Sequence, residues 1–203
     1  MIMQERIEEL LRRESRAISE IPVTASFNQA VTLIHDRVHG RKGKLICSGM
    51  GKAGQISINI ATTFSSTGTP SVFLHPSDAQ HGDLGVIQEN DLMLLISNSG
   101  KTREILELVQ LSRHLYPGLP LIVITGNPEG ELAGIADVCI HTGSPDEVCP
   151  LGLTPTTSTT AMTVIGDILV VLMMERIGFT RDQYARRHHG GYLGTKSRNK
   201  KES

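Results

Sequence analysis

Residues 91–104, DLMLLISNSGKTRE, carry the clearest structural pattern in the sequence. The nearly unbroken apolar run that ends at Ile96 is typical of a strand buried on both faces of a parallel sheet. A short polar turn follows, and Ile105, Leu108 and Val109 then recur at the spacing of a helix. The segment is therefore predicted to form a strand, a tight turn and the start of a helix.

The turn at residues 97–102 has the composition of a phosphate-binding loop. The first amide groups of a helix lack partners within the helix, and the helix dipole favours an anion. Hydroxyl groups can donate hydrogen bonds, and glycine lets the backbone come close to a ligand. We therefore expect Ser97, Asn98, Ser99, Gly100 and Thr102 to bind a phosphate monoester, with a plain helix-capping loop as the alternative. The triphosphate-binding pattern GxxxxGK[ST] does not occur in the sequence.

Strand and helix patterns alternate along most of the chain. Further apolar runs predict strands at residues 45–47, 71–74, 121–124 and 138–140, with helical segments between them, one of which is expected from about 55 to 66. Such alternation predicts an α/β fold in which helices cover both sides of an open parallel sheet. The turns after the strands then meet at one edge of the sheet, where ligands of such sheets bind.

The remaining segments are expected to complete a single domain of 203 residues, with its core at 41–194. Residues 1–40 are predicted to form two amphipathic helices broken near Pro22, with part of their surface packed on another subunit. Residues 161–177 are apolar almost all round, which indicates a helix in the core or at a subunit contact. The last ordered segment is expected at 181–194, followed by a disordered basic tail at 195–203.

Composition argues against several classes of protein. The net charge is -1 and Trp is absent, so neither nucleic acid nor an anionic membrane is expected as a partner. The longest apolar run, 168–174, is far shorter than the ~20 residues that span a bilayer, and the charged N-terminus does not resemble a signal peptide. Cys47, Cys139 and Cys149 lack CxxC spacing and are interpreted as free thiols in a reducing cytoplasm.

The glycines at 49, 51 and 54 fit the GxGxxG pattern of a dinucleotide site, but the match fails further on. The acidic residue expected ~20 residues later is replaced by His75 and Pro76. Lys52, inside this loop, is better explained as a positive charge for a phosphate or a sugar oxyanion.

Four ionisable residues, Lys52, His81, Glu104 and His188, are candidates for chemistry. Each has an ordinary alternative, such as an interaction of Glu104 with the helix dipole. Beside a phosphate loop, however, they fit aldose–ketose isomerisation. That reaction needs a base for the C1–C2 proton, an acid or base for ring opening and the O1/O2 proton, and a cation for oxygen charge. His81, His188 and His189 lack the spacing of a metal site, so no metal is expected.

Taken in order, these motifs resemble the sugar isomerase (SIS) domain family, and within it the D-arabinose 5-phosphate isomerases of the Kdo pathway. The likeness extends from about Lys44 to Gly194. It is carried by GMGKAG (49–54), FSSTGTPSVFLHPSDAQHGDLG (64–85), ISNSGKTREI (96–105), ITGNPEGELAGIADV (124–138), CPLGLTPTTSTTA (149–161), GD (166–167) and HHGGYLG (188–194).

The resemblance implies a three-layer α/β/α sandwich with a five-stranded parallel sheet of flavodoxin-like type. It also implies a homotetramer with active sites at subunit contacts. The implied activity is cofactor-independent interconversion of D-ribulose 5-phosphate and D-arabinose 5-phosphate in the cytoplasm, supplying Kdo, lipopolysaccharide or capsule synthesis.

Motif matches also imply roles for residues. Glu104 is expected as the enediol base and His188 for ring opening or proton shuttling, while His81 and Lys52 polarise sugar oxygens. Further expected substrate-binding residues are Ser48, Gly49 and Thr157.

The sequence departs from the family pattern in several places and leaves alternatives open. Lys101 stands where an acidic residue is common, Gln55 where histidine is frequent, and His189 where proline is usual. Full-length members continue into a tandem pair of CBS domains, so regulation through such domains is expected to be absent. The alternatives are an isomerase for another phosphosugar, a non-catalytic sensor of a phosphosugar or Kdo metabolite, and a purely structural oligomerisation domain.

Overall fold

The computed structural model of the protein describes residues 2–198. Its centre is a five-stranded parallel sheet in the order β2-β1-β3-β4-β5. The strands are β1 Leu45–Gly49, β2 Ser71–Phe73, β3 Leu92–Ile96, β4 Leu121–Thr125 and β5 Val138–His141. The predicted α/β fold with a five-stranded parallel sheet is confirmed, and the strand order reverses between β1 and β3.

The central strand β3 is buried along its whole length, as its apolar run predicts. Leu92, Leu94 and Ile96 pack into one hydrophobic core, while Met93 and Leu95 pack into another. Alternate side chains of a strand point to opposite faces, so the sheet separates two cores. The edge strand β2 is only half-buried.

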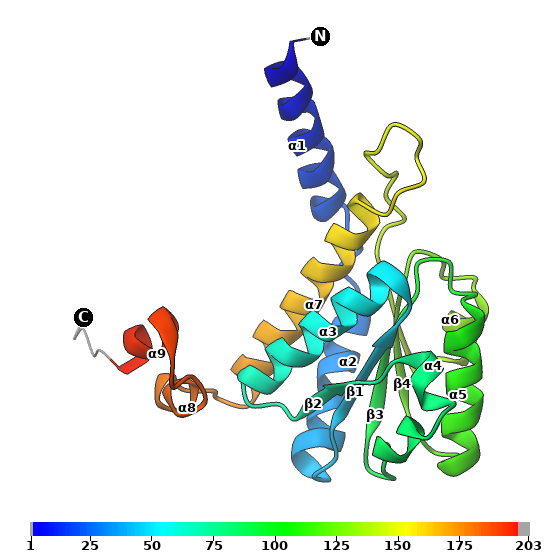
Figure 1. The fold of residues 1–203 in the computed structure, drawn as a ribbon, viewed down its shortest axis with the longest axis vertical. Helices are drawn as coiled ribbons and strands as arrows, with labels where there is room; N and C mark the ends of the chain where they lie inside the picture. The colour runs from blue at the N-terminus through cyan, green and yellow to red at the C-terminus, as the bar shows by residue number, and fades with distance from the viewer. Residues whose placement is uncertain (1, 199–203) are drawn as a thin grey trace.

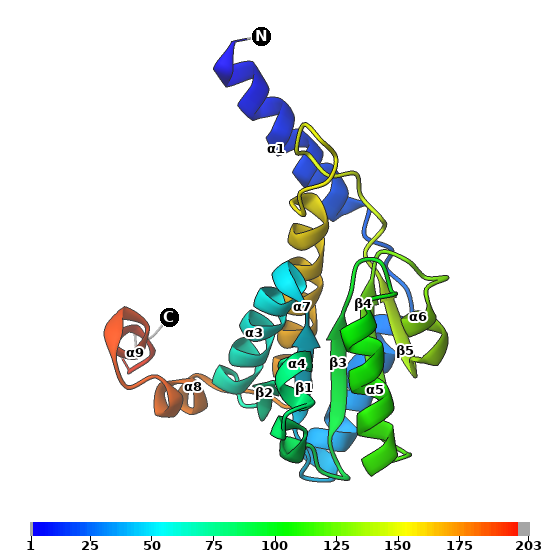
Figure 2. The ribbon, with the colours of Figure 1, turned by 45° about the vertical axis from the view of Figure 1, so that its right-hand side comes forward.

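Helices cover both faces of the sheet (Figures 1 and 2). One core receives buried side chains from α2, α3 and α7, and the other receives them from α4, α5 and α6. The helices are α1 Met3–Ser19, α2 Ser26–Ile34, the π-helical η1 His35–Gly40, α3 Gly51–Ser66, α4 Pro76–Ala79, the 3-10 helix η2 Asp83–Val86, α5 Arg103–Leu115, α6 Glu131–Ile135, α7 Thr157–Arg176, α8 Arg181–Arg187 and α9 Gly191–Arg198.

The helix α7 is long and apolar enough in composition to cross a membrane, and among the described residues it alone meets that test. Half of its most apolar window is nevertheless buried inside the protein. At Gly166 a Cβ atom would lie 2.4 Å from Cδ1 of Ile60, so α7 packs directly on α3. One side of α7 thus belongs to the core, while Ile168 and Val171 are 36% and 51% exposed, so the expected choice between a core position and a subunit contact stays open for its other side.

Two parts of the chain extend from the sandwich (Figure 1). The helix α1 stands away from the body and exposes Met3, Ile7 and Leu11 by 75%, 50% and 62%. The pair α8 and α9 lies on another side, beyond the end of α3. The helix α9 continues past Gly194 to Arg198, so residues 195–198 are helical rather than part of a disordered tail. The rest of the expected tail, 199–203, lies outside the described residues.

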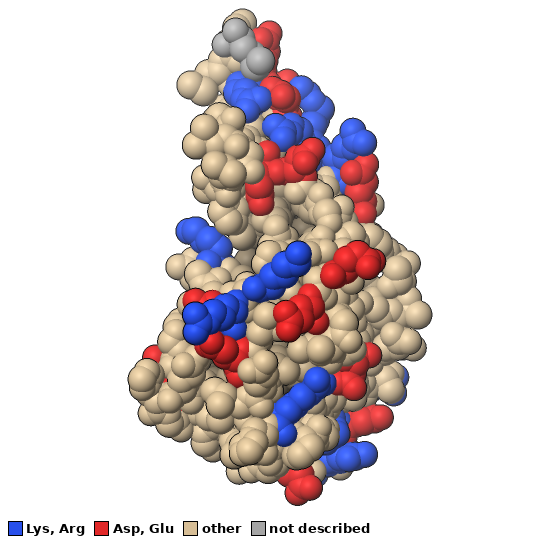
Figure 3. All heavy atoms as spheres, turned by 90° about the vertical axis from the view of Figure 1, so that its right-hand side faces the viewer, with Lys and Arg blue, Asp and Glu red and all other residues tan. Residues whose placement is uncertain are grey.

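Charged side chains are mixed in sign on the face shown in Figure 3. Lys and Arg alternate there with Asp and Glu over the body and along α1, without a broad patch of one sign on that face. This distribution agrees with the small net charge of the sequence, -1.

Candidate active site

A pocket of about 330 Å³ opens where β1 and β3 end, at the reversal of strand order. Ligands of open parallel sheets bind at this position. We call it the strand-edge pocket, and three segments form it. Its lining residues are Met50, Lys52, Ala53, Ile96, Ser97, Asn98, Ser99, Thr102, Pro155, Ser158, Thr159 and Met162.

The polar turn after β3 is held in shape by the turn after β4. The side chain of Asn127 donates to the backbone oxygen of Ser99 at 2.9 Å, and the amide of Gly126 donates to the backbone oxygen of Asn98 at 3.1 Å. Gly100 has φ of +64°, a conformation that favours glycine. The backbone and the Asn127 side chain of the turn after β4 therefore fix the polar turn before any ligand binds.

Hydroxyl groups of the turn lie together at the start of α5. The Oγ atom of Ser97 lies 2.7 Å from Oγ1 of Thr102, and the amide of Lys101 donates to Oγ of Ser99 at 3.2 Å. Thr102 is the residue that precedes the first turn of α5, and Glu104 lies in that turn. The first amides of α5 and these hydroxyls are thus gathered at one position suited to an anion.

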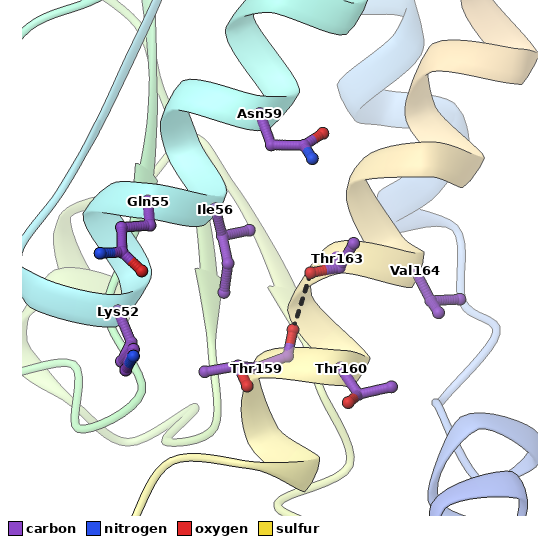
Figure 4. A pocket seen from close by; sticks show the side chains of 8 residues that line it. All are labelled: Lys52, Gln55, Ile56, Asn59, Thr159, Thr160, Thr163 and Val164. Carbon is purple, nitrogen blue, oxygen red and sulfur yellow. Dashed lines mark hydrogen bonds between the residues drawn. The ribbon is translucent and has the colours of Figure 1, made fainter.

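Lys52 adds a positive charge to the lining of the strand-edge pocket. It lies in the first turn of α3 and lines both the strand-edge pocket and a second cavity of about 380 Å³ between α3 and α7. Figure 4 shows this second cavity, which we call the interhelix pocket. Its lining residues are Lys52, Gln55, Ile56, Asn59, Thr159, Thr160, Thr163 and Val164. Because Lys52 and Thr159 line both pockets, the two cavities adjoin.

Three expected binding residues have structural roles in this chain. The hydroxyl of buried Ser48 donates to the backbone oxygen of Leu74 at 2.6 Å. Gly49 gives α3 room, because a Cβ atom there would lie 2.8 Å from the backbone of Ala53. The hydroxyl of buried Thr157 donates to Glu14 at 3.0 Å. The described lining of the two pockets includes none of Ser48, Gly49 and Thr157.

Neither His81 nor His188 is among the described lining residues of the two pockets. His81 is exposed in the turn after α4. His188 follows α8, which contacts the turn at Gly68 just beyond the end of α3. Lys52 is at the other end of α3, a helix of 16 residues that is about 24 Å long at 1.5 Å per residue. One chain therefore brings Lys52, the polar turn and the start of α7 together, but not His188.

Glu147 was missed by sequence reasoning. Its carboxylate accepts hydrogen bonds from the amide and hydroxyl of Thr156 at 2.7 and 2.8 Å, and from the hydroxyl of Ser158. Desolvation raises the pKa of Glu147, but these hydrogen bonds outweigh it and hold the pKa below its usual value. Since Ser158 and Thr159 line the strand-edge pocket, Glu147 orders one of its walls.

A signal for Glu147 exists in the sequence. The run of hydroxyl residues at 156–160 begins a helix, and such a start attracts an anion. A carboxylate slightly upstream in the sequence, such as that of Glu147, can supply this anion.

The structure offers no evident metal site in the part of the chain that it describes. Residues 2–198 contain no group of three or more His, Cys, Asp or Glu side chains placed to hold an ion.

Comparison with known proteins identifies relatives across most of the chain. The SIS domain family model matches residues 40–172. The arabinose 5-phosphate isomerase KdsD of Shigella flexneri is 45% identical over 188 residues, which make up 93% of this chain and 56% of that protein. The chain thus spans little more than half the length of this curated relative.

Solved structures of similar sequence also have the same fold as this chain. A crystal structure of a candidate phosphosugar isomerase involved in capsule formation, from Bacteroides fragilis NCTC 9343, is 67% identical with a TM-score of 0.92 and covers 94% of this chain and 99% of that one. An Escherichia coli CFT073 protein in complex with arabinose 5-phosphate is 33% identical with a TM-score of 0.84 and covers 93% and 100%. With its sheet, its polar turn and these matches in agreement, the chain belongs to the SIS domain family.

Proposed function

We propose that this protein is an aldose–ketose isomerase that interconverts D-ribulose 5-phosphate and D-arabinose 5-phosphate without a cofactor. The observation that carries the proposal is the strand-edge pocket, which is lined by Lys52 and by a preorganised hydroxyl-rich turn. This turn leads into the first turn of α5, which carries Glu104. The identity to KdsD and to the protein bound to arabinose 5-phosphate supports this choice of substrate.

The polar turn would bind the phosphate. Ser97, Ser99 and Thr102 supply hydroxyl donors, and Asn98 and Gly100 complete the loop at the start of α5. Because the turn after β4 already fixes the loop, little conformational entropy is lost when the ligand binds. The sugar would then extend from the phosphate toward Lys52 and the interhelix pocket.

Glu104 would act as the base. Its carboxylate takes the C2 proton of the aldose, the electron pair forms the enediol, and the same carboxyl returns the proton to C1 of the ketose. A second proton moves between O1 and O2. The ammonium of Lys52 stabilises the developing negative charge on oxygen, with His81 assisting.

His188 would reach this pocket from another subunit. In one chain it lies beyond the far end of α3 from Lys52, so a role in ring opening or proton shuttling requires a neighbouring copy. The exposed apolar residues of α1, Met3, Ile7 and Leu11, support a subunit contact. We therefore infer a homotetramer with active sites at subunit contacts, working in the cytoplasm. The relative named for capsule formation supports a role in Kdo, lipopolysaccharide or capsule synthesis.

The test is an assay in which purified protein is given D-ribulose 5-phosphate or, in parallel, hexulose and heptulose phosphates as alternative substrates. The proposal expects arabinose 5-phosphate as the fastest-formed product. Faster conversion of another phosphosugar would contradict the substrate assignment. Binding of these sugars without turnover of any of them would contradict the isomerase itself.

A further inference from the structure

The ring of His188 is fixed in a specific orientation by Tyr184, one helical turn earlier. The two rings stack with centroids 3.7 Å apart and an interplanar angle of 9°. In this position Nδ1 of His188 lies 3.0 Å from the backbone oxygen of Tyr184. A carbonyl oxygen can only accept, so Nδ1 must carry the proton of this hydrogen bond. In the neutral ring, Nε2 is then the unprotonated nitrogen.

Tyr184 is itself held against the body of the protein. The edge of its ring meets Phe179, with centroids 6.5 Å apart and an interplanar angle of 74°. Phe179 packs so closely on the turn after α3 that a Cβ atom at Gly68 would lie 2.8 Å from its ring. The guanidinium of Arg187 covers Phe179 at 5.4 Å. A continuous series of packing contacts thus runs from Gly68 through Phe179 and Tyr184 to His188.

The start of α8 is also fixed. The amide of Gln183 donates to Oγ1 of Thr180 at 3.2 Å, and the amide of Thr180 donates to the side chain of Gln183 at 2.9 Å. This reciprocal cap stabilises the short helix that carries Tyr184. Within residues 2–198 no protein group bonds Nε2 of His188, so that nitrogen is available for a ligand.

We propose that Tyr184 is a positioning residue that holds His188 as the Nδ1–H tautomer and so makes Nε2 its proton acceptor. The proposal rests on the proposed function, in which His188 takes part. Nε2 accepts a proton from a sugar hydroxyl, whose oxygen keeps the electron pair, and the ring becomes imidazolium. The same Nε2–H then returns the proton to the sugar oxygen on which negative charge has developed, which restores the neutral ring.

The test combines nitrogen NMR of the full chain labelled with 15N-histidine and steady-state kinetics. The signal of His188 is identified by its loss in His188→Gln. In the neutral wild-type ring, Nδ1 should be protonated and Nε2 should not be. Tyr184→Leu, which removes the stacked ring, should move the tautomer toward Nε2–H. It should also lower kcat by about 10-fold, part of the roughly 10²–10⁴-fold that a positioned acid or base contributes. KM should stay near the wild-type value.

Tyr184→Phe is the matched control, because it keeps the ring and removes only the hydroxyl. It should retain both the tautomer and the kcat of the wild type. A wild-type His188 found as Nε2–H would overturn this proposal while leaving the isomerase proposal intact. An equal fall in kcat in Tyr184→Phe and Tyr184→Leu would overturn the role of ring stacking. Normal turnover in His188→Gln would remove His188 from the proposed chemistry, and the positioning role with it.

Discussion

Glu104 occupies a position where a carboxylate can serve either the helix or the substrate. It lies in the first turn of α5, where the helix dipole favours a negative charge. Of its possible partners, Arg103 pairs instead with Glu107 at 2.7 Å. The carboxylate of Glu104 is therefore not committed to that ion pair.

Substitution of Glu104 by Gln distinguishes these roles. It removes the base but keeps the size of the side chain, so kcat should fall by roughly 10²–10⁴-fold, the scale of acid–base catalysis. KM should change little, because the phosphate contacts come from the polar turn. Glu107→Gln, on the same helix, is the control and should keep its turnover. Near-normal kcat in Glu104→Gln would show that Glu104 is not the base.

The cysteines should differ in reactivity. Desolvation raises the pKa of the Cys149 thiol, but the amides of Thr154 and Leu153 donate to Sγ at 3.1 and 3.2 Å and hold the pKa below its usual value. Burial raises the pKa of Cys47 to about 12. A lowered pKa means more thiolate at a given pH, so Cys149 should be alkylated by iodoacetamide first.

Mass spectrometry of the alkylated peptides across a pH series measures this difference. The reaction of Cys149 should rise at lower pH than that of an ordinary thiol, and Cys47 should remain unmodified in the folded protein. Cys149→Ser should abolish the fast phase. A fast phase that persists in Cys149→Ser would contradict the assignment.

The role of a single residue can be predicted from the sequence when its partners lie in the same short segment. The polar turn was identifiable because its strand, its hydroxyls and its helix start are contiguous in 91–104. The role of Glu147 depends on donors at Thr156 and Ser158, which only the folded loop brings to it. Likewise, no sequence pattern reveals that the hydroxyl of Ser48 is bonded to Leu74.

At the scale of elements, the start of α7 depends on the carboxylate of Glu147. The pKa of Glu147 is lowered in the folded protein, so its contribution to stability is fully present above the pKa of an unfolded glutamate. That contribution is lost as the pH falls through the lower folded-state pKa. Glu147→Gln should therefore lower Tm at neutral pH, with a smaller difference from the wild type in acid.

Thermal unfolding followed by circular dichroism from neutral to acidic pH measures this effect. Glu129→Gln, at an exposed carboxylate in the loop before α6, is the control and should leave Tm unchanged. A deficit in Tm for Glu147→Gln that stays constant down to strongly acidic pH would contradict a role for the ionised carboxylate.

Helix propensity did not predict the first residues of α3 and α7 correctly. The helices α3 and α7 begin at Gly51 and Thr157, four residues before the expected starts at 55 and 161. Glycine and threonine are weak helix formers, so their sequences suggested loops. Packing overrides this preference, since Gly54 lets α3 lie against β1, where a Cβ atom would be 2.7 Å from the Gly49 oxygen.

At the scale of the molecule, the alternation of strands and helices was sufficient to predict the parallel sheet. Handedness and loop length leave few ways to arrange such units. The placement of α1 and of α8 and α9 was not predictable in the same way. Their exposed apolar side chains, including Ile7 and Leu11, are not covered by the described chain, and an isolated sequence carries no pattern for a partner surface.

A site shared between subunits predicts complementation. Glu104→Gln and His188→Gln should each be nearly inactive alone. Co-expressed in equal amounts, they should recover about a quarter of wild-type activity, because random assembly of symmetric oligomers pairs an intact Glu104 with an intact His188 at that frequency. The measurement is the activity of the purified mixed oligomers. Activity no higher than that of the single variants would contradict a site shared between subunits.

As the proposed isomerase, this protein would move a proton between C1 and C2 of a pentose phosphate through an enediol. The most direct test is NMR of D-ribulose 5-phosphate incubated with the purified protein and EDTA in D₂O. We expect arabinose 5-phosphate that carries deuterium at C2. Absence of conversion, with the same sugar still raising Tm, would contradict an isomerase and indicate a protein that only binds it.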